Sequence, residues 1–197
     1  MPLLNRAMDM QPEISAWRRH LHQMPELQYD VHQTAAFVAQ KLKEFGCDEV
    51  ATGLGRTGVV GIINGSKGPG ATIGLRADMD ALPVTEATNL PHASKTPGKM
   101  HACGHDGHMA MLLGAARHLT ETRNFAGSVA VIFQPAEEGG GGGREMVRDG
   151  MMERFNIREV YGMHNMPGLP LGEFAIRKGG IMAATDEFNI TITGNTG

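Results

Sequence analysis

The hydrophobic positions near the start of the chain follow the spacing of amphipathic helices. Apolar residues between Ile14 and Leu21 recur every three or four positions and predict a short first helix, which ends near Pro25. Residues 34–45 keep the same spacing and predict a second helix, with Gly46 in the position of a C-terminal cap. The chain therefore opens with two predicted helices.

Beyond this cap the pattern changes from helical spacing to short apolar runs. Residues 58–63 and 71–75 are two such runs, separated by turn-forming residues, and they predict neighbouring buried strands. Residues 108–122 return to helical spacing and predict a third helix. The remaining predicted elements are a buried strand at 128–133, strands at 160–163 and 172–176, a short helix at 146–152, and a half-exposed strand at 187–193.

The alternation of strands with helices is typical of an α/β sandwich whose sheet is largely buried. The pattern leaves the order of the strands open. The glycine pair Gly179-Gly180 is the natural domain boundary, because the residues after it change to strand-like alternation. We therefore divide the chain into residues 1–179 and residues 180–197.

Length and composition narrow the class of protein further. The 197 residues are enough for one domain and a small or incomplete second one. The 18 basic and 21 acidic residues give a net charge of −3 with no basic stretch, which argues against a nucleic-acid partner. No apolar run has the length of a signal peptide core or of a membrane span, and two cysteines are too few for a disulfide scaffold. We expect no membrane partner and a cytoplasmic location.

Polar residues follow directly after several predicted strands, where ligands bind in open α/β sheets. Asp78 and Asp80 follow the strand that ends near Leu75, although taken alone this pair is more typical of a capped, solvated turn. His164 stands at the tip of the strand predicted at 160–163. A lone histidine there is more often a satisfied core residue, but as one of several strand-end groups it is a ligand candidate.

The segment at 101–108 (HACGHDGH) concentrates metal-ligating residue types directly before a helix. Cys103 and His105 are separated by one glycine, so in an extended loop both side chains can converge on one point. A thiolate and an imidazole suit Zn²⁺, Co²⁺, Ni²⁺ or Mn²⁺, and Asp106 can accept a hydrogen bond from a histidine N–H. The alternative is a buried thiol with helix-capping groups, which three histidines, a cysteine and an aspartate in eight residues make improbable.

Two adjacent glutamates, Glu137 and Glu138, end the apolar strand predicted at 128–133. They are costly there unless a cation or a proton is shared nearby, although a solvated acidic turn is the alternative. Because adjacent side chains point in different directions, one glutamate can bind a metal while the other handles a proton. The glycine run at 139–143 lacks the Lys-Ser/Thr of a nucleotide loop, and we expect it to permit close backbone approach or a mobile loop.

Together these segments offer sulfur, nitrogen and oxygen ligands. Cys103, His105 and His164 with one of the two glutamates make a set of the kind that hydrolytic metal sites need. The other glutamate is placed to take a proton from water and return it to a leaving amine. The residues alone do not fix which glutamate does which.

The chain resembles the M20 metallopeptidases, and within them the amidohydrolase branch of hippurate hydrolases, N-acyl-amino-acid hydrolases and auxin-conjugate hydrolases. The likeness covers essentially the whole chain, and several independent motifs in the right order make it specific. These motifs are 17–27 (WRRHLHQMPEL), 76–83 (RADMDALP), 100–108 (MHACGHDGH), 133–139 (FQPAEEG) and 162–165 (GMHN).

The resemblance implies an enzyme that hydrolyses amides with two divalent metal ions, which could be Zn, Mn, Ni or Co. It assigns the catalytic base to Glu137, an orienting role to Asp80, and metal binding to Cys103, His105, Glu138 and His164. Asp78 occupies a place where other branches use a metal-binding histidine, so the resemblance assigns it no role. The implied reaction releases a carboxylic acid and an amino acid from an N-acyl amino acid such as hippurate.

The resemblance also implies a fold and an assembly. The fold is a three-layer α/β/α sandwich with a mixed, mostly parallel sheet, like that of zinc exopeptidases. Residues 180–197 would begin a lid or dimerisation domain, and the full-length protein would be a homodimer. Because the family's later segments supply one further histidine ligand, we expect an N-terminal fragment with most of the metal site and little or no turnover.

Two other functions stay open. The first keeps the family but changes the substrate to N-acetyl- or N-succinyl-diaminopimelate, or to a dipeptide. The second is a non-catalytic metal-binding or interaction protein, in which replacing Glu137 by Gln would change nothing measurable in function.

Overall fold

The computed structural model describes residues 4–183 and 188–194. The chain divides into two compact units, one that runs to Asn165 and one that begins at Met166. All the helices and strands of the described residues belong to the first unit. The division falls ahead of the Gly179-Gly180 pair.

The first unit alternates helices with strands, as the sequence pattern predicts. It opens with helices α1 (Asn5–Gln23) and α2 (His32–Phe45), followed by strands β1 (Glu49–Leu54), β2 (Gly58–Asn64) and β3 (Thr72–Asp78). It continues with α3 (His105–Thr122), β4 (Ser128–Gln134), the short helices α4 (Gly142–Arg148) and α5 (Met151–Arg154), and β5 (Ile157–Gly162).

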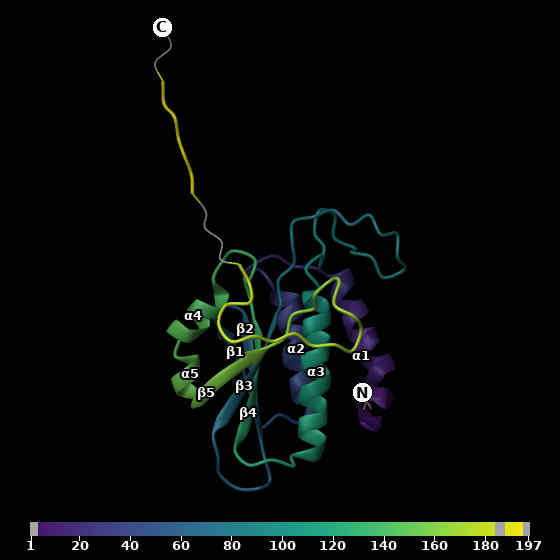
Figure 1. Cartoon of the computed structure of the whole chain (residues 1–197), viewed down its shortest axis with the longest axis vertical. Coiled ribbons are helices and arrows are strands. Elements are labelled where there is room, and N and C mark those ends of the chain that lie inside the picture. The colour runs from purple at the N-terminus through teal and green to yellow at the C-terminus, as the bar shows by residue number, and fades with distance from the viewer. Residues whose placement is uncertain (1–3, 184–187, 195–197) are drawn as a thin grey trace. The chain divides into compact units, whose positions relative to one another are not determined.

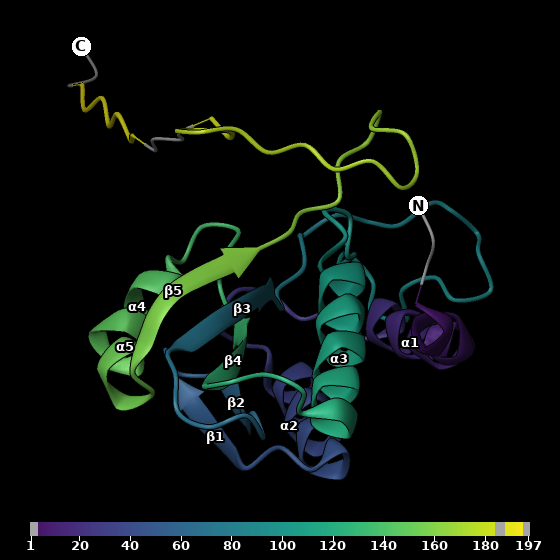
Figure 2. The same ribbon diagram turned by 60° about the horizontal axis from the view of Figure 1, so that its bottom comes forward.

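The strands form one mixed sheet between two layers of helices, which confirms the predicted α/β sandwich (Figure 1). The strand order is β1-β2-β4-β3-β5. Strand β3 pairs in parallel with β4 and β5, whereas the β1–β2 and β2–β4 pairs are antiparallel. Helices α1, α2 and α3 cover one face of the sheet, and α4 and α5 cover the other (Figures 1 and 2).

Strand β4 shows why the central strands read as continuous apolar runs. Its side chains alternate between two cores, so that Val131 and Phe133 pack under α1–α3 while Ala130 and Ile132 pack under α4 and α5. Because both faces are covered, no position of this stretch of β4 faces water, and the alternation typical of a half-exposed strand is missing.

The structure corrects several of the predicted elements. Strands β2 and β3 are not neighbours, because β4 lies between them and pairs with both. Strand β1 was not predicted, and the helix predicted at 146–152 is two helices, interrupted at Gly150 with a φ of +81°. The third helix begins at His105, three residues before its predicted start.

The predictions at the C-terminal end differ from the structure as well. Residues 172–176 form no strand, and no strand is present over 188–193, while Glu187 lies outside the described residues. A strand requires a hydrogen-bonded neighbour, and no described segment pairs with either stretch. The assignment of residues 180–197 to a lid domain stays a prediction.

Candidate metal centre

The parallel strands bring the predicted site residues to one edge of the sheet. Strand β3 leads into Asp78 and Asp80, β4 into the two glutamates, and β5 into His164. Because β3, β4 and β5 run in the same direction, their carboxyl ends lie side by side (Figure 2).

The other two predicted ligands are Cys103, in the loop before helix α3, and His105, in the first turn of that helix. Gly104 adopts a φ of +89° before this helix, and His105 is the first helical residue. Candidate ligand atoms of Cys103, His105 and His164 lie within 4.8 Å of one another, and those of His105, Glu137 and Glu138 do so as well. All the sequence-predicted ligands therefore converge around His105.

The ring of His105 is held so that one nitrogen is left free. Its Nδ1–H donates a hydrogen bond of 2.7 Å to the backbone oxygen of Asp80, which fixes the tautomer. Its Nε2 is buried and has no hydrogen-bond partner among the described residues. This nitrogen lies 3.6 Å from Oε1 of Glu138 and 3.8 Å from Oε2 of Glu137. An unprotonated nitrogen that faces carboxylates is the arrangement of a metal ligand.

His164 shows the same arrangement at the exposed side of the site. Its Nδ1–H donates to the backbone oxygen of Asn165 at 2.7 Å, and its Nε2 lies 3.4 Å from Sγ of Cys103. Burial raises the pKa of the Cys103 thiol to about 12, and the nearby charge of Glu138 acts in the same direction. A bound cation would reverse this effect, because a coordinated thiol is deprotonated.

Asp80 contacts three other residues of the site. Its two carboxylate oxygens accept the backbone N–H groups of Glu137 at 2.8 Å and Glu138 at 3.0 Å, and its own carbonyl oxygen accepts from His105. Burial raises the pKa of this carboxyl, against the two N–H bonds, which lower it. A single buried aspartate thus fixes both glutamates and one histidine.

The two glutamates differ in their surroundings. The side chain of Glu137 is 38% exposed, whereas that of Glu138 is 20% exposed and its Oε1 is buried without a hydrogen-bond partner in the described part of the chain. Burial and the adjacent charge of Glu138 raise the pKa of Glu137. One glutamate is therefore open to a reacting molecule, and the other points inward beside His105.

These residues fit a divalent cation. Nε2 of His105 and Oε1 of Glu138 are buried polar atoms with no partner among residues 4–183 and 188–194, and each needs a donor or a cation to offset its burial. The two atoms lie 3.6 Å apart. The thiol of Cys103 and the imidazole of His164 lie beside His105, and together these groups make a borderline-soft set of donors.

The structure also shows partners that the sequence did not indicate. Asp106 accepts a hydrogen bond from a histidine, as expected, but the donor is Nδ1 of His22 from α1, at 2.8 Å. Nε2 of His22 lies 3.2 Å from Glu86, and the hydrogen bond to Asp106 raises the pKa of His22. His22 lies 84 positions from Asp106 and 64 from Glu86, so no local motif connects these residues.

The glycine run at 139–143 gives the close backbone approach that we expected. A Cβ atom at Gly142 would lie 1.8 Å from the backbone oxygen of Pro135, so no other residue fits there without movement. The hydroxyl of Tyr29 donates to the backbone oxygen of Gly140 at 2.6 Å. The run therefore folds tightly behind Glu138 and leads into α4.

Comparison with known proteins identifies the family. Residues 74–195 match Peptidase family M20/M25/M40, and the chain belongs to this family. It is 48% identical to the hippurate hydrolase of Campylobacter jejuni and 46% identical to thermostable carboxypeptidase 1 of Saccharolobus solfataricus. Both alignments cover 100% of this chain and 51% of the relative. The chain thus spans about half the length of these curated relatives.

A solved structure with the same fold supports the assignment. The YXEP protein of Bacillus subtilis, described as a dinuclear metal-binding peptidase from the M20 family, matches with a TM-score of 0.78 and 40% identity. The match covers 84% of this chain and 46% of that one. No helix in the described part of our chain combines the length and the apolar character that crossing a membrane requires.

Proposed function

We propose that the residues gathered around His105 form the metal site and the proton-transfer group of an amidohydrolase that acts on N-acyl amino acids such as hippurate. The observation that carries the proposal is the environment of His105, whose buried and unpartnered Nε2 lies within 3.6–3.8 Å of carboxylate oxygens of Glu137 and Glu138. The likeness to a hippurate hydrolase supports the substrate class.

Each residue has a role in this proposal. Cys103, His105, Glu138 and His164 hold the metal ions, and Asp80 orients His105 and both glutamates. A divalent cation supplies a Lewis acid that polarises the amide carbonyl and acidifies water. Glu137 takes a proton from the attacking water at its carboxylate and delivers it to the nitrogen of the leaving amino acid.

The position of Glu137 suits this task. It is the more exposed glutamate, so its carboxylate is within reach of a substrate, and its backbone N–H is fixed on Asp80. Its raised pKa, caused by burial and by the charge of Glu138, makes it a stronger base than an ordinary glutamate.

The donor set bears on the identity of the metal. A thiolate with two imidazoles favours Zn²⁺, Co²⁺ or Ni²⁺ over Mn²⁺, which prefers oxygen ligands. We propose two ions per site by analogy with the dinuclear YXEP protein.

The test separates metal binding from proton transfer with two neighbouring substitutions. In the chain described here, Glu138→Gln is expected to weaken Zn²⁺ binding in a calorimetric titration, while Glu137→Gln is expected to leave it nearly unchanged. In the whole protein, Glu137→Gln is expected to slow the release of glycine from hippurate by about a hundred- to ten-thousand-fold. Unchanged hydrolysis in the Glu137 variant would refute its role as the base.

A second candidate, hydrolysis of peptides, is favoured by the 46% identity to thermostable carboxypeptidase 1. A panel of hippurate, N-acetyl amino acids, N-acetyl- and N-succinyl-diaminopimelate and dipeptides separates the candidates by their kcat/KM values. Preference for dipeptides would contradict the proposed substrate class but would be compatible with the proposed metal site. The homodimer and the cytoplasmic location stay predictions.

A further inference from the structure

Asp78, to which the resemblance assigns no role, is fully buried at the end of β3 and has two strong partners. Its Oδ2 accepts from Nη1 of Arg76 at 2.8 Å, and its Oδ1 accepts from Nδ1 of His108 at 2.7 Å. Its Oδ2 also lies 3.6 Å from Nε2 of His105. Both oxygens are therefore engaged by the protein itself.

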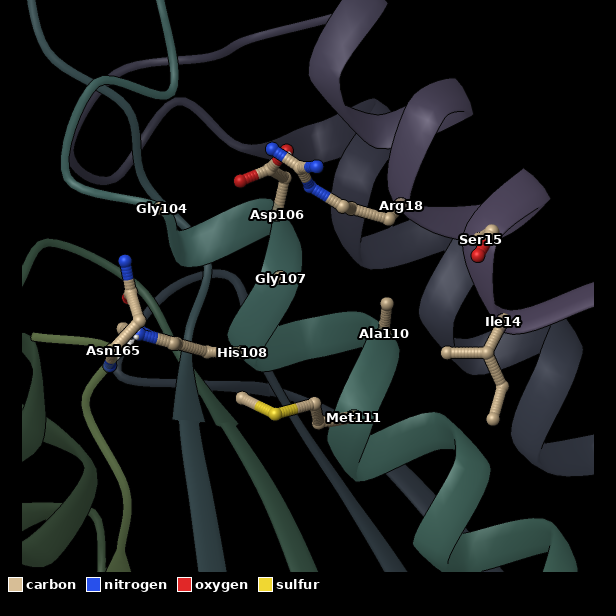
Figure 3. Close-up of a pocket in the computed structure, with 10 residues that line it drawn as sticks. All are labelled: Ile14, Ser15, Arg18, Gly104, Asp106, Gly107, His108, Ala110, Met111 and Asn165. Atoms are coloured by element: carbon tan, nitrogen blue, oxygen red, sulfur yellow. Dashed lines mark hydrogen bonds and ion pairs between the residues drawn. The ribbon is translucent and has the colours of Figure 1, made fainter. Parts of the chain in front are cut away.

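The ring of His108 is engaged at both nitrogens by Asp78 and Asn165, whereas His105 and His164 each turn Nε2 toward other predicted ligands. A carboxylate only accepts hydrogen bonds, so Nδ1 carries the proton that faces Asp78, and Nε2 of the neutral ring is left as an acceptor. That acceptor faces the backbone N–H of Asn165 at 3.0 Å. The side-chain atom placed against the same nitrogen is Oδ1 of Asn165, and because two acceptors do not bond each other, we assign the amide with its NH₂ toward Nε2. Figure 3 shows His108 and Asn165 pointing toward each other.

The peptide unit held by His108 is the one that carries His164. Nε2 of His108 receives the N–H of Asn165, and the carbonyl oxygen of Asn165 receives Nδ1–H of His164. The two rings lie edge to face, with centroids 4.6 Å apart. Hydrogen bonds from Arg76 through Asp78 and His108 thus reach the N–H of Asn165, and a further one joins the carbonyl oxygen of that residue to the ring that faces Cys103.

We propose that Asp78 and His108 are positioning residues that hold His164 with its Nε2 toward Cys103. Asp78 selects the tautomer of His108, and His108 fixes the backbone of Asn165, which in turn sets the tautomer and direction of His164. This inference rests on the proposed metal-binding role of His164.

A rival arrangement uses the same residues differently. Asp78, His105 and His108 also bring candidate ligand atoms within 4.8 Å of one another, as a metal site would. In that arrangement His108 must give up Asp78 or Asn165 to free a nitrogen. The positioning role keeps the hydrogen bonds of His108 to Asp78 and to the backbone N–H of Asn165, and it leaves His105 as the ligand with a free Nε2.

Two substitutions of His108 separate its two contacts. The amide of an asparagine lies near the position of Nδ1 and keeps the contact with Asp78, whereas the amide of a glutamine reaches the position of Nε2 and keeps an acceptor for Asn165. Positioning predicts that His108→Asn weakens Co²⁺ binding by the chain by about 10- to 100-fold, as loss of an outer partner of a ligand does. His108→Gln is expected to lose much less Co²⁺ affinity. His118→Gln, on the same helix, is the control for a histidine outside the site.

A metal-free measurement tests the inference independently of the proposed function. Long-range ¹H–¹⁵N NMR spectra report which ring nitrogen of each histidine carries the proton. We expect His164 to be protonated at Nδ1 in the wild-type chain and in His108→Gln, and to become a mixture of tautomers in His108→Asn. Asp78→Asn, in which Arg76 holds the amide oxygen and turns the NH₂ toward His108, is expected to disturb His164 as well.

The experiments distinguish a failure of this inference from a failure of the proposed function on which it rests. A wild-type chain that binds no Co²⁺ would refute the metal site, while the NMR result still decides the positioning. Unchanged His164 tautomers in both His108→Asn and Asp78→Asn would overturn the inference. So would the loss of one whole equivalent of bound metal in both His108 variants, because His108 would then be a ligand.

Discussion

At the scale of single residues, the histidines of this chain differ in what their ring nitrogens contact. His105 and His164 each donate one N–H to a backbone carbonyl and leave the other nitrogen facing the site. His22 and His108 have partners at both nitrogens, and buried His101 has none among the described residues. A ring nitrogen that faces other predicted ligands, more than the residue type, distinguishes the ligand candidates.

The two thiols give a prediction about reactivity. Burial raises the pKa of Cys103 to about 12 and that of Cys47 to about 11, so both are almost fully protonated at neutral pH in the metal-free chain. We expect iodoacetamide to alkylate both slowly at pH 7, with rates that rise about tenfold per pH unit because the thiolate is the nucleophile. Mass spectrometry of Cys47→Ser and Cys103→Ser separates the sites, and rapid labelling of Cys103 at pH 7 would contradict the burial argument.

Sequence reasoning identified the residues that converge on the site and, through the resemblance, Asp80, which holds three of them, but not the other residues that hold the site. Cys103 and His105 were recognisable because the motif places them side by side, and the strand ends indicated Glu137, Glu138 and His164. The contact between Asp78 and His108 joins residues 30 positions apart in different elements, and that between His22 and Asp106 joins residues 84 apart. The first pair is brought together by the packing of α3 on β3 and the second by the packing of α1 on α3, which local patterns do not encode.

At the scale of elements, the loop before α3 depends on a glycine. Gly104 has a φ of +89°, which L side chains rarely adopt, and a Cβ there would lie 2.5–2.9 Å from atoms of the Asn165 side chain. Gly46, which caps α2, has a similar φ of +83° but nothing within 4 Å of the added Cβ. The two positions share the backbone strain and differ only in the steric conflict.

This difference predicts the effects of two alanine substitutions. Gly46→Ala is expected to lower the free energy of unfolding by about 1 kcal/mol from strain alone. Gly104→Ala is expected to lower the free energy of unfolding by more than this. It is also expected to weaken Co²⁺ binding, because Asn165 must move away from its place beside His108. Urea unfolding and a metal titration measure the two effects. Equal losses of stability and unchanged Co²⁺ affinity would contradict the contact with Asn165.

The elements themselves were largely predictable where their periodicity is strong. The second and third helices and strand β4 were found, and the αL cap at Gly46 confirms its predicted role. The order of the strands was not predictable, because β4 enters between β2 and β3 by pairing with residues that lie 56 to 74 positions earlier in the sequence. The strand predicted at 172–176 failed for a related reason, since an apolar run becomes a strand only when a partner is present.

At the scale of the whole molecule, buried His101 makes stability depend on pH. Burial lowers its pKa from 6.5 to about 4, so between these values the unfolded chain binds more protons than the folded one. The contribution of His101 to stability is complete above pH 6.5 and is lost as the pH falls toward 4, by up to about 3 kcal/mol.

Unfolding experiments on a variant isolate this contribution. As the pH is lowered from 7 to 4, we expect the unfolding free energy of the wild type to fall relative to that of His101→Gln. His118→Gln is a control in which the same difference is expected to stay flat. A parallel pH dependence of wild type and His101→Gln would show that His101 does not titrate as its burial requires.

The central claim is that Cys103, His105, Glu138 and His164 form a divalent metal centre, and a Co²⁺ titration of the chain followed by absorption tests it most directly. We predict saturable binding with a sulfur-to-cobalt charge-transfer band, which persists in Cys47→Ser and disappears in Cys103→Ser. The absence of saturable binding in the wild-type chain, or a band that survives Cys103→Ser, would contradict the account.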